Sequence, residues 1–141
     1  MASRLHVVIG ILRDKQGRFF ITLRDQNKHK GGLWEFPGGK VEQGEDSRGA
    51  ISRELREEIS IDVVDMEHFM DVFYDYEDLK VYLEVFNVTN YRGRAAASEG
   101  QRQTWISIDK AIGSESEFSF PEANYPILQK LLTEAKCVGF D

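Results

Sequence analysis

One stretch of the chain places three carboxylates on the same side of a helix. Glu54, Glu57 and Glu58 are spaced i, i+3 and i+4, and residues at that spacing share one face of an α-helix. Each like-charge pair on an exposed helix costs about 0.2–0.5 kcal/mol. A bound cation would reverse the sign of this interaction, and oxygen-only ligands suit a hard divalent ion such as Mg²⁺ or Mn²⁺. A solvated acidic surface is the alternative interpretation of these three residues alone.

The residues before the glutamates extend the pattern. Five residues separate Gly39 from Glu45, and seven more precede Arg53, which opens the sequence Arg-Glu-Leu-Arg-Glu-Glu. This pattern resembles the box of the Nudix family, G-x5-E-x7-R-E-U-x-E-E-x-G-U, where U is a bulky aliphatic residue. Ser60 replaces the last glycine of the box. In the family that glycine ends the helix in a left-handed conformation, so a serine there is expected either to cost some stability or to change the turn.

Length and composition favour one domain over residues 1–141, because the chain can form one hydrophobic core but not two. A net charge of −6 argues against a nucleic-acid polymer as partner. Cys137 is the only cysteine, which excludes an intrachain disulfide. No apolar run approaches the roughly 18 residues of a transmembrane helix, and the N-terminus lacks a signal-peptide pattern. We therefore expect a cytoplasmic enzyme that acts as a monomer and has no membrane partner.

Hydrophobic periodicity predicts alternating strands and helices. A helix capped by Asp46 or Ser47 buries a stripe formed by Ile51, Leu55 and Ile59. A flexible loop is expected at 93–100, and a closing helix at 126–136. Strands are expected at 5–12 and 18–23, joined as a hairpin, and at 34–36, 61–64, 69–76, 80–88 and 105–107. Along the chain the order is strands, one helix, more strands and then a closing helix, which predicts an α/β domain. The resemblance implies the Nudix fold, an α/β/α sandwich around a mixed β-sheet.

Similarity to the MutT branch of the family extends over nearly the whole chain. It includes the entry Trp-Glu-Phe-Pro-Gly-Gly-Lys40 and, most specifically, the segment Phe120-Pro-Glu-Ala-Asn124. The resemblance implies a pyrophosphohydrolase that converts 8-oxo-dGTP to 8-oxo-dGMP and pyrophosphate, and so removes a mutagenic precursor from the nucleotide pool.

The resemblance also implies roles for the acidic residues. The Gly38 carbonyl and the carboxylates of Glu54, Glu57 and Glu58 correspond to the metal ligands of the family, with Mg²⁺ as the expected ion and Mn²⁺ as an alternative. Glu99 corresponds to a loop carboxylate that contacts the metal or acts near the attacking water. Both Glu54 and Glu99 are candidates for the general base. Two residues of the box have supporting roles: Arg53 orients a neighbouring glutamate through a charge-assisted pair, and Glu45 holds the loop to the helix.

Four further residues are expected near the nucleotide. Asn124 corresponds to the residue that recognises the oxidised purine, since an amide offers both a donor and an acceptor. Arg24 corresponds to a basic residue near the nucleotide, Phe36 can line the base pocket, and His29 precedes the box in a loop that can approach substrate. Each has an alternative role: Asn124 as a helix cap, Arg24 and His29 as surface residues, and Phe36 as part of the core.

Two other functions compete with hydrolysis of 8-oxo-dGTP. The first is hydrolysis of a different nucleotide by the same chemistry, such as CTP or dCTP, ADP-ribose or a capped RNA end. The second is a non-catalytic module that binds a nucleotide. Such modules typically lose glutamates of the box, whereas Glu54, Glu57 and Glu58 are all present in this chain.

Overall fold

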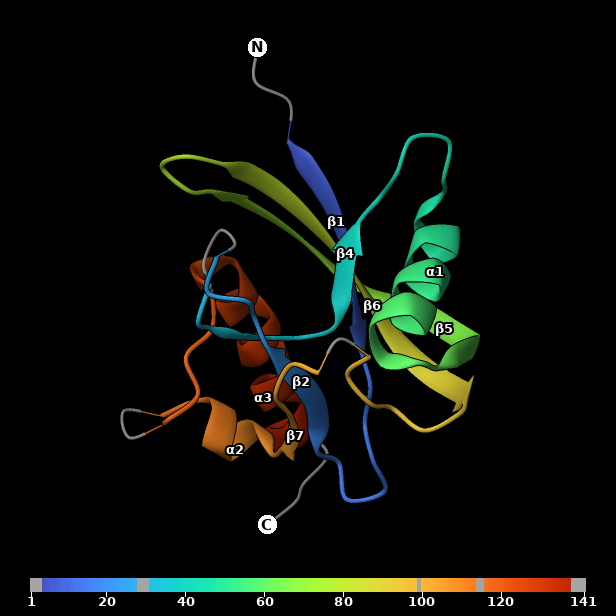
Figure 1. Cartoon of the computed structure of the whole chain (residues 1–141). Helices are drawn as coiled ribbons and strands as arrows, with labels where there is room; N and C mark the ends of the chain where they lie inside the picture. Colours follow the sequence, from blue (N-terminus) through green and yellow to red (C-terminus); the bar gives the residue numbers. More distant parts are fainter. Residues whose placement is uncertain (1–3, 28–30, 99, 114–115, 138–141) are drawn as a thin grey trace.

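The strands form two sheets in the computed structural model, which describes residues 4–27, 31–98, 100–113 and 116–137 (Figure 1). The larger sheet has the order β4-β1-β6-β5, with strands β1 (Leu5–Ile11), β4 (Gly38–Lys40), β5 (Asp62–Asp75) and β6 (Lys80–Arg92). It is mixed, because β1 runs parallel to β6 while the other pairs are antiparallel. The smaller, antiparallel sheet has the order β3-β2-β7, with strands β2 (Phe19–Leu23), β3 (Trp34–Glu35) and β7 (Gln103–Ile106).

Helices lie on both sides of these strands. Helix α1 (Ser47–Ile59) lies on one side of the larger sheet, and α3 (Tyr125–Cys137) lies on the other side with the short helix α2 (Ile108–Ala111) (Figure 1). A 3-10 turn, η1 (Glu122–Asn124), leads directly into α3. The α/β class and the layered arrangement predicted from the sequence are therefore confirmed.

Alternation along the strands divides the core into two clusters. On β1, Ile9 and Ile11 face the α3 side, whereas Val8 faces the α1 side. Helix α1 buries Ala50 together with the predicted stripe of Ile51, Leu55 and Ile59. These four α1 residues are fully buried, so packing against the sheet fixes the orientation of the helix and of its acidic face.

Both ends of α1 follow the sequence prediction. The Asp46 side chain caps the helix by accepting a hydrogen bond from the Gly49 N–H at 2.7 Å. At the other end, Ser60 has φ 62° and ψ 35°, the left-handed conformation expected at the box glycine. Among the non-glycine residues that the structure describes, Ser60 alone has a positive φ. The backbone can therefore form the glycine-type helix end, but with a residue that adopts it less easily.

The predicted hairpin between the first two strands forms only beside its turn, where the Phe20 N–H donates to the Leu12 carbonyl and the Asp14 N–H to the Arg18 carbonyl. β1 pairs with β4 and β6, whereas β2 pairs with β3 and β7, and the link between them is the isolated bridge Arg13–Phe19. The two runs are close in sequence, but β1 has its parallel partner more than 70 residues away. The strands predicted at 61–64 and 69–76 are parts of one long strand, β5, whose register shifts at several points.

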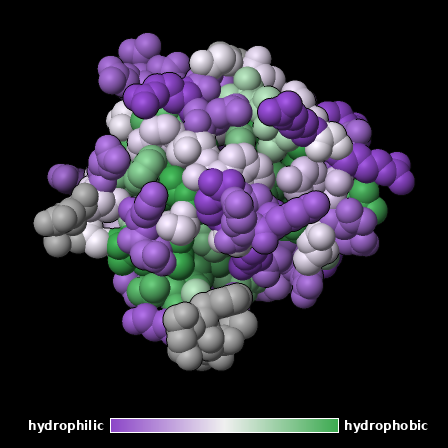
Figure 2. Space-filling view, turned by 90° about the horizontal axis from the view of Figure 1, so that it is seen from below, coloured by the Kyte–Doolittle hydropathy of each residue, from purple (hydrophilic) through white to green (hydrophobic). Residues whose placement is uncertain are grey.

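Hydrophilic residues spread over the face seen in Figure 2, and hydrophobic residues show between them in interrupted patches. Large hydrophobic side chains that are exposed include Phe73 on β5, at 62%. Among the described residues, no helix is both long and apolar enough to cross a membrane.

Replacing Ser60 by glycine should stabilise the fold, because glycine adopts a positive φ without steric cost. We expect the Ser60→Gly variant to gain about 0.5–1 kcal/mol in free energy of unfolding, measured by urea denaturation. Ser107→Gly is the matched control, since Ser107 has φ −78° and makes no side-chain capping bond. The control should gain nothing; an equal gain in both variants would contradict the role of the left-handed conformation.

Candidate active site

A cleft of about 1100 Å³ lies beside the larger sheet and contains most of the predicted site residues. Its apolar wall comes from β1 and β6, and its acidic wall comes from α1. A volume of this size is at the upper end of the usual range for small-molecule sites, about 300–1000 Å³, and can accommodate a nucleoside triphosphate. The predicted residues that line the cleft are Arg24, Phe36, Gly38, Glu54, Glu57, Glu58 and Asn124.

Two glycines let the acidic helix approach the sheet closely. A Cβ atom on Gly39 would lie 2.3 Å from Cδ of Glu54, and one on Gly38 would lie 2.0 Å from the Val8 carbonyl oxygen. The Gly38 N–H donates to Oε2 of Glu58 at 3.3 Å. The absence of a side chain at Gly38 lets β4 lie against the backbone of β1, and at Gly39 it leaves space for the Glu54 carboxylate, so β4 and the carboxylates of α1 are in direct contact.

Arg53 connects the box loop, β4 and the acidic face. Its guanidinium donates to both carboxylate oxygens of Glu45, at 2.7 and 2.9 Å, and to the Lys40 carbonyl at 3.1 Å. The same group donates to Glu54 at 3.0 Å and to Glu57 at 3.2 Å. Five donors in a rigid plane suit this arrangement, and lysine could not reproduce it. Arg53 thus offsets part of the repulsion between the glutamates of α1.

The carboxylates of this network differ in their environment. Burial raises the pKa of Glu54, and the hydrogen bond from Arg53 offsets part of that rise. The Glu54 side chain is 18% exposed, whereas that of Glu57 is 62% exposed. In Glu45 the hydrogen bonds from Arg53 lower the pKa from 4.5 to about 2. Glu54 is therefore much more enclosed than Glu57, and Glu45 is an ionised partner of Arg53.

The loop expected to be flexible is anchored to the C-terminal end of α1. The Ser98 N–H donates to the Glu58 carbonyl at 2.8 Å, and the Ala96 N–H donates to the Ile59 carbonyl at 3.0 Å. The Ser98 hydroxyl also donates to the Glu58 carbonyl, at 2.8 Å. These bonds satisfy helix-end carbonyls that have no partner within the helix. Glu99, predicted as catalytic and metal-binding, lies outside the described residues, but its neighbour Gly100 lines the cleft.

Asn124 lines the cleft and carries a buried amide oxygen without a hydrogen-bond partner among the described residues. The residue is 6% exposed, and the unpaired atom is Oδ1. The Ala123 N–H next to it donates to the Tyr76 hydroxyl at 3.0 Å, which holds this turn against the end of β5. Because Oδ1 accepts no backbone N–H there, it does not act as the cap of the last helix. A buried polar atom of this kind is costly unless a ligand pairs with it.

Of the other predicted substrate residues, Arg24 and Phe36 line the cleft, whereas His29 lies outside the described residues. Arg24 forms an ion pair with Glu35, at 3.0 Å between Nη1 and Oε2, and both residues line the cleft. Phe36 is 3% exposed and packs against Phe120, so it belongs to the core as well as to the cleft wall.

Sequence reasoning missed several residues of the cleft. Tyr76 belongs to no motif, and Glu35 lies within the Trp-Glu-Phe-Pro-Gly-Gly-Lys40 segment without a predicted role of its own. Tyr76 reaches the cleft because β5 extends to the turn beside η1, and burial raises the pKa of its hydroxyl. The apolar residues of β1 and β6 in the wall follow from the pairing of these two strands, which a local pattern does not reveal: Leu5, Val7, Ile9, Val81 and Leu83.

Comparison with known proteins agrees with this geometry. The NUDIX domain model matches residues 8–130. The chain is 34% identical over 129 residues to the 8-oxo-dGTP diphosphatase of Escherichia coli (strain K12), covering 92% of this chain and 97% of that protein. It is 29% identical over 125 residues to the CTP pyrophosphohydrolase of the same strain, covering 89% of this chain and 90% of that protein.

Solved structures give the same result. A chain from work on MutT of Aliivibrio salmonicida and Vibrio cholerae is 38% identical, with a TM-score of 0.76 and coverage of 94% of this chain and 99% of that one. The solution structure of the E. coli ORF135 protein is 28% identical, with a TM-score of 0.81 and coverage of 99% and 96%.

The layered fold and the carboxylate-lined cleft are those of an enzyme that acts on nucleotides. The chain belongs to the Nudix family. It is a Nudix hydrolase, an enzyme that cleaves phosphoric anhydride bonds, and members of this family generally need a divalent metal ion.

The Arg53–Glu45 pair should make stability depend on pH in the acid range. Because the folded-state pKa of Glu45 lies below its ordinary value of 4.5, the pair stabilises the fold above pH 4.5 and loses its effect as pH falls towards about 2. We expect Glu45→Gln to be less stable than wild type at pH 7, with the difference shrinking over that window. Urea denaturation from pH 2 to 7 measures it. Glu67→Gln, an exposed carboxylate on β5, is the control; a pH-independent difference for Glu45→Gln would contradict the pair's role.

Proposed function

We propose that this Nudix hydrolase converts 8-oxo-dGTP to 8-oxo-dGMP and pyrophosphate. The observation that carries the proposal is the buried, unpaired amide oxygen of Asn124 in the same cleft as Glu54, Glu57 and Glu58. The relatives named 8-oxo-dGTP diphosphatase support it, among them the protein of Proteus vulgaris at 39% identity over 98 residues.

The acidic wall fits a divalent cation, for which we propose Mg²⁺, with Mn²⁺ as an alternative. Glu54, Glu57, Glu58 and the Gly38 carbonyl supply only oxygen donors, the type that Mg²⁺ prefers. Glu54 and Glu58 already contact β4, and we propose that Glu99 completes the set. When bound, the metal offsets the charge of the phosphates and lowers the pKa of a coordinated water.

The chain's own residues then position the reacting groups. We propose Glu54 as the general base, because its carboxylate is only 18% exposed, against 62% for Glu57, and lies against Gly39. Arg53 is a positioning residue: it holds Glu54 and Glu57 without lining the cleft itself. Water attack at the β-phosphorus forms the new P–O bond and breaks the bridge to the α-phosphate, which leaves with the nucleoside monophosphate.

In this proposal the nucleobase is recognised by Asn124 and the apolar wall of the cleft, and not by the acidic wall. The amide of Asn124 pairs with the edge of the oxidised guanine, which presents both donors and acceptors. Phe36 and the apolar residues of β1 and β6 enclose the ring, and Arg24 on the cleft wall contacts the nucleotide. His29, outside the described residues, is proposed as a further substrate residue from the sequence alone. Pairing by a buried amide is selective, because a base that fails to pair leaves Oδ1 unsatisfied.

A CTP pyrophosphohydrolase is the second candidate. One relative with that name is 29% identical over 89% of this chain. The same acidic wall serves either substrate, so the choice depends on the base pocket. We further propose that the chain acts as a single domain over residues 1–141, as a monomer, and in the cytoplasm, where the nucleotide pool lies.

Release of pyrophosphate from 8-oxo-dGTP, dGTP and CTP tests the function. We expect Mg²⁺-dependent release with the highest kcat/KM for 8-oxo-dGTP, and no release after chelation. Higher kcat/KM for CTP would favour the second candidate. No release from a wider nucleotide panel would favour a module that only binds nucleotides.

Removing the amide of Asn124 should reduce the preference for 8-oxo-dGTP over dGTP more than it slows the chemical step. We expect Asn124→Ala to lower the preference for 8-oxo-dGTP over dGTP by about 10- to 100-fold, the equivalent of one buried hydrogen bond of about 1–3 kcal/mol. The ratio of the two kcat/KM values measures it. Asn90→Ala, an exposed asparagine on β6, is the matched control. An unchanged ratio in Asn124→Ala would exclude this residue from base recognition.

Removing the carboxylate of Glu54 should stop the reaction without unfolding the chain. We expect Glu54→Gln to lower kcat by about 10²–10⁴-fold, the usual contribution of a general base. Stability should not fall, since the change removes a partly buried charge. Steady-state kinetics and urea denaturation measure the two effects, with Glu67→Gln as control. Turnover close to wild type would show that Glu54 is not the general base and would leave Glu99 as the other candidate.

A further inference from the structure

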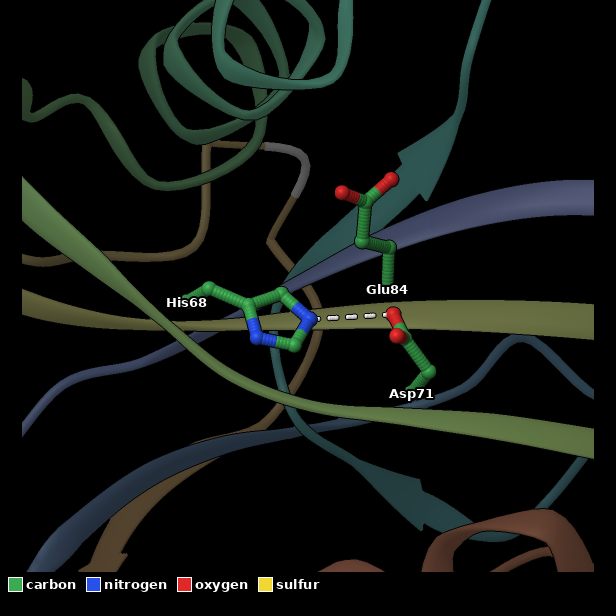
Figure 3. A group of neighbouring side chains, drawn as sticks. All are labelled: His68, Asp71 and Glu84. Carbon is green, nitrogen blue, oxygen red and sulfur yellow. Dashed lines mark hydrogen bonds and ion pairs between the residues drawn. The ribbon is translucent and has the colours of Figure 1, made fainter.

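A second cluster of potential metal ligands lies on the larger sheet, outside the cleft. His68 and Asp71 come from β5 and Glu84 from β6, and one ligand atom from each lies within 4.8 Å of the others. Figure 3 shows the His68 ring joined to Asp71 by a hydrogen bond, with the Glu84 carboxylate above them. None of the three lines the cleft.

A fourth donor comes from β1. His6 Nε2 lies 2.9 Å from Oε1 of Glu84, and the His6 ring stacks on Tyr82 at 4.7 Å between centroids. The cluster therefore offers two imidazoles and two carboxylates from three neighbouring strands. On β1 and β6, His6 and Glu84 alternate with Leu5, Val7, Val81 and Leu83, which line the cleft. The cluster and the cleft thus occupy opposite faces of the same sheet.

A β-bulge creates this cluster. In a regular strand, residues three apart point to opposite faces, so His68 and Asp71 would not meet. The register shifts by one residue between His68 and Met70: His68 pairs with Phe86, and Asp71 pairs with Glu84. The extra residue, Phe69, is buried in the core on the α3 side. The bulge places both side chains on the α1 side, the type of reorientation for which bulges are used near functional sites.

Surrounding groups hold the carboxylates in place. The Ser47 hydroxyl, at the start of α1, donates to Glu84 at 2.5 Å, and the Tyr82 hydroxyl donates to Asp71 at 2.9 Å. Hydrogen bonds of this kind orient the ligands of metal sites and strengthen metal binding. The Asp71 and Glu84 side chains are 40% and 19% exposed, so an ion can reach them from solvent.

We propose that His68, Asp71 and Glu84, with His6 as a fourth ligand, form a binding site for a transition-metal ion of the Zn²⁺ type. Imidazole nitrogen with carboxylate oxygen favours Zn²⁺, Co²⁺ or Ni²⁺, whereas the oxygen-only wall of the cleft favours Mg²⁺. Four donors at about 2.0–2.2 Å from one ion lie about 3.3 Å apart, so the three grouped ligand atoms, now within 4.8 Å of one another, would move closer together on binding, and His6 would join through its contact with Glu84. The ion would balance the two carboxylates and tie β1, β5 and β6 to Ser47 of α1.

Cobalt titration of the full-length, chelator-treated protein tests the site. Four-coordinate Co²⁺ with nitrogen ligands absorbs strongly in the visible range, and six-coordinate Co²⁺ in an oxygen-only site absorbs weakly. We expect one equivalent of strong absorbance that Zn²⁺ displaces. His68→Ala and Glu84→Gln should lose it, with Zn²⁺ affinity at least about 10-fold weaker. Two control variants should keep the strong cobalt absorbance. Asp65→Asn changes an exposed carboxylate on β5, the strand of His68 and Asp71, and Glu57→Gln changes the cleft.

A second measurement covers the case in which a variant fails to fold. In the wild-type protein, substoichiometric Zn²⁺ should shift the imidazole NMR signals of both His6 and His68. Loss of the cobalt absorbance only in Glu57→Gln, no strong absorbance in wild type, or unshifted imidazole signals would each overturn the proposal. Because His68 lies outside the cleft, Mg²⁺-dependent hydrolysis by His68→Ala should match wild type, which separates this site from the proposed function.

Discussion

The acidic wall depends on the hydrogen bonds that the Arg53 guanidinium donates to its neighbouring carboxylates. Three glutamates on one helical face repel each other, and one of them, Glu54, is largely enclosed. Arg53 supplies the compensating charge through Glu54 and Glu57, and it is itself held by Glu45 and the Lys40 carbonyl. The box loop, β4 and α1 are thereby fixed to one another. A cation in the cleft adds charge to a site whose carboxylates already have defined positions.

The larger sheet separates the cleft on one face from the cluster of imidazoles and carboxylates on the other. One face forms the wall of the cleft, where apolar residues of β1 and β6 meet the oxygen donors of α1 and the unpaired amide of Asn124. The other face carries imidazoles and carboxylates on the same strands. Strict alternation along β1 and β6 gives each face its own residues. The bulge at Phe69, one of several register shifts along β5, brings His68 and Asp71 to the same face and completes the second cluster.

The sequence could predict what depends on local pattern. The box, the cap at Asp46, the buried stripe of α1 and the left-handed Ser60 all follow from residue type and spacing. Pairing between distant segments could not be predicted in this way. The hairpin of the first two strands does not extend beyond its turn, because β1 pairs with β6 instead. The anchoring of the 93–98 loop depends on helix-end carbonyls that only the fold brings near. The assigned roles of Glu99 and His29 stay predictions, since both lie outside the described residues.

The central claim is that one cleft holds the triphosphate against α1 and the base against Asn124. The most direct measurement is a crystal structure with Mn²⁺ and a non-hydrolysable analogue of 8-oxo-dGTP. The account predicts metal density bounded by Glu54, Glu57 and Glu58, with the oxidised base paired to the Asn124 amide. A base bound away from Asn124, or metal density away from α1, would contradict it.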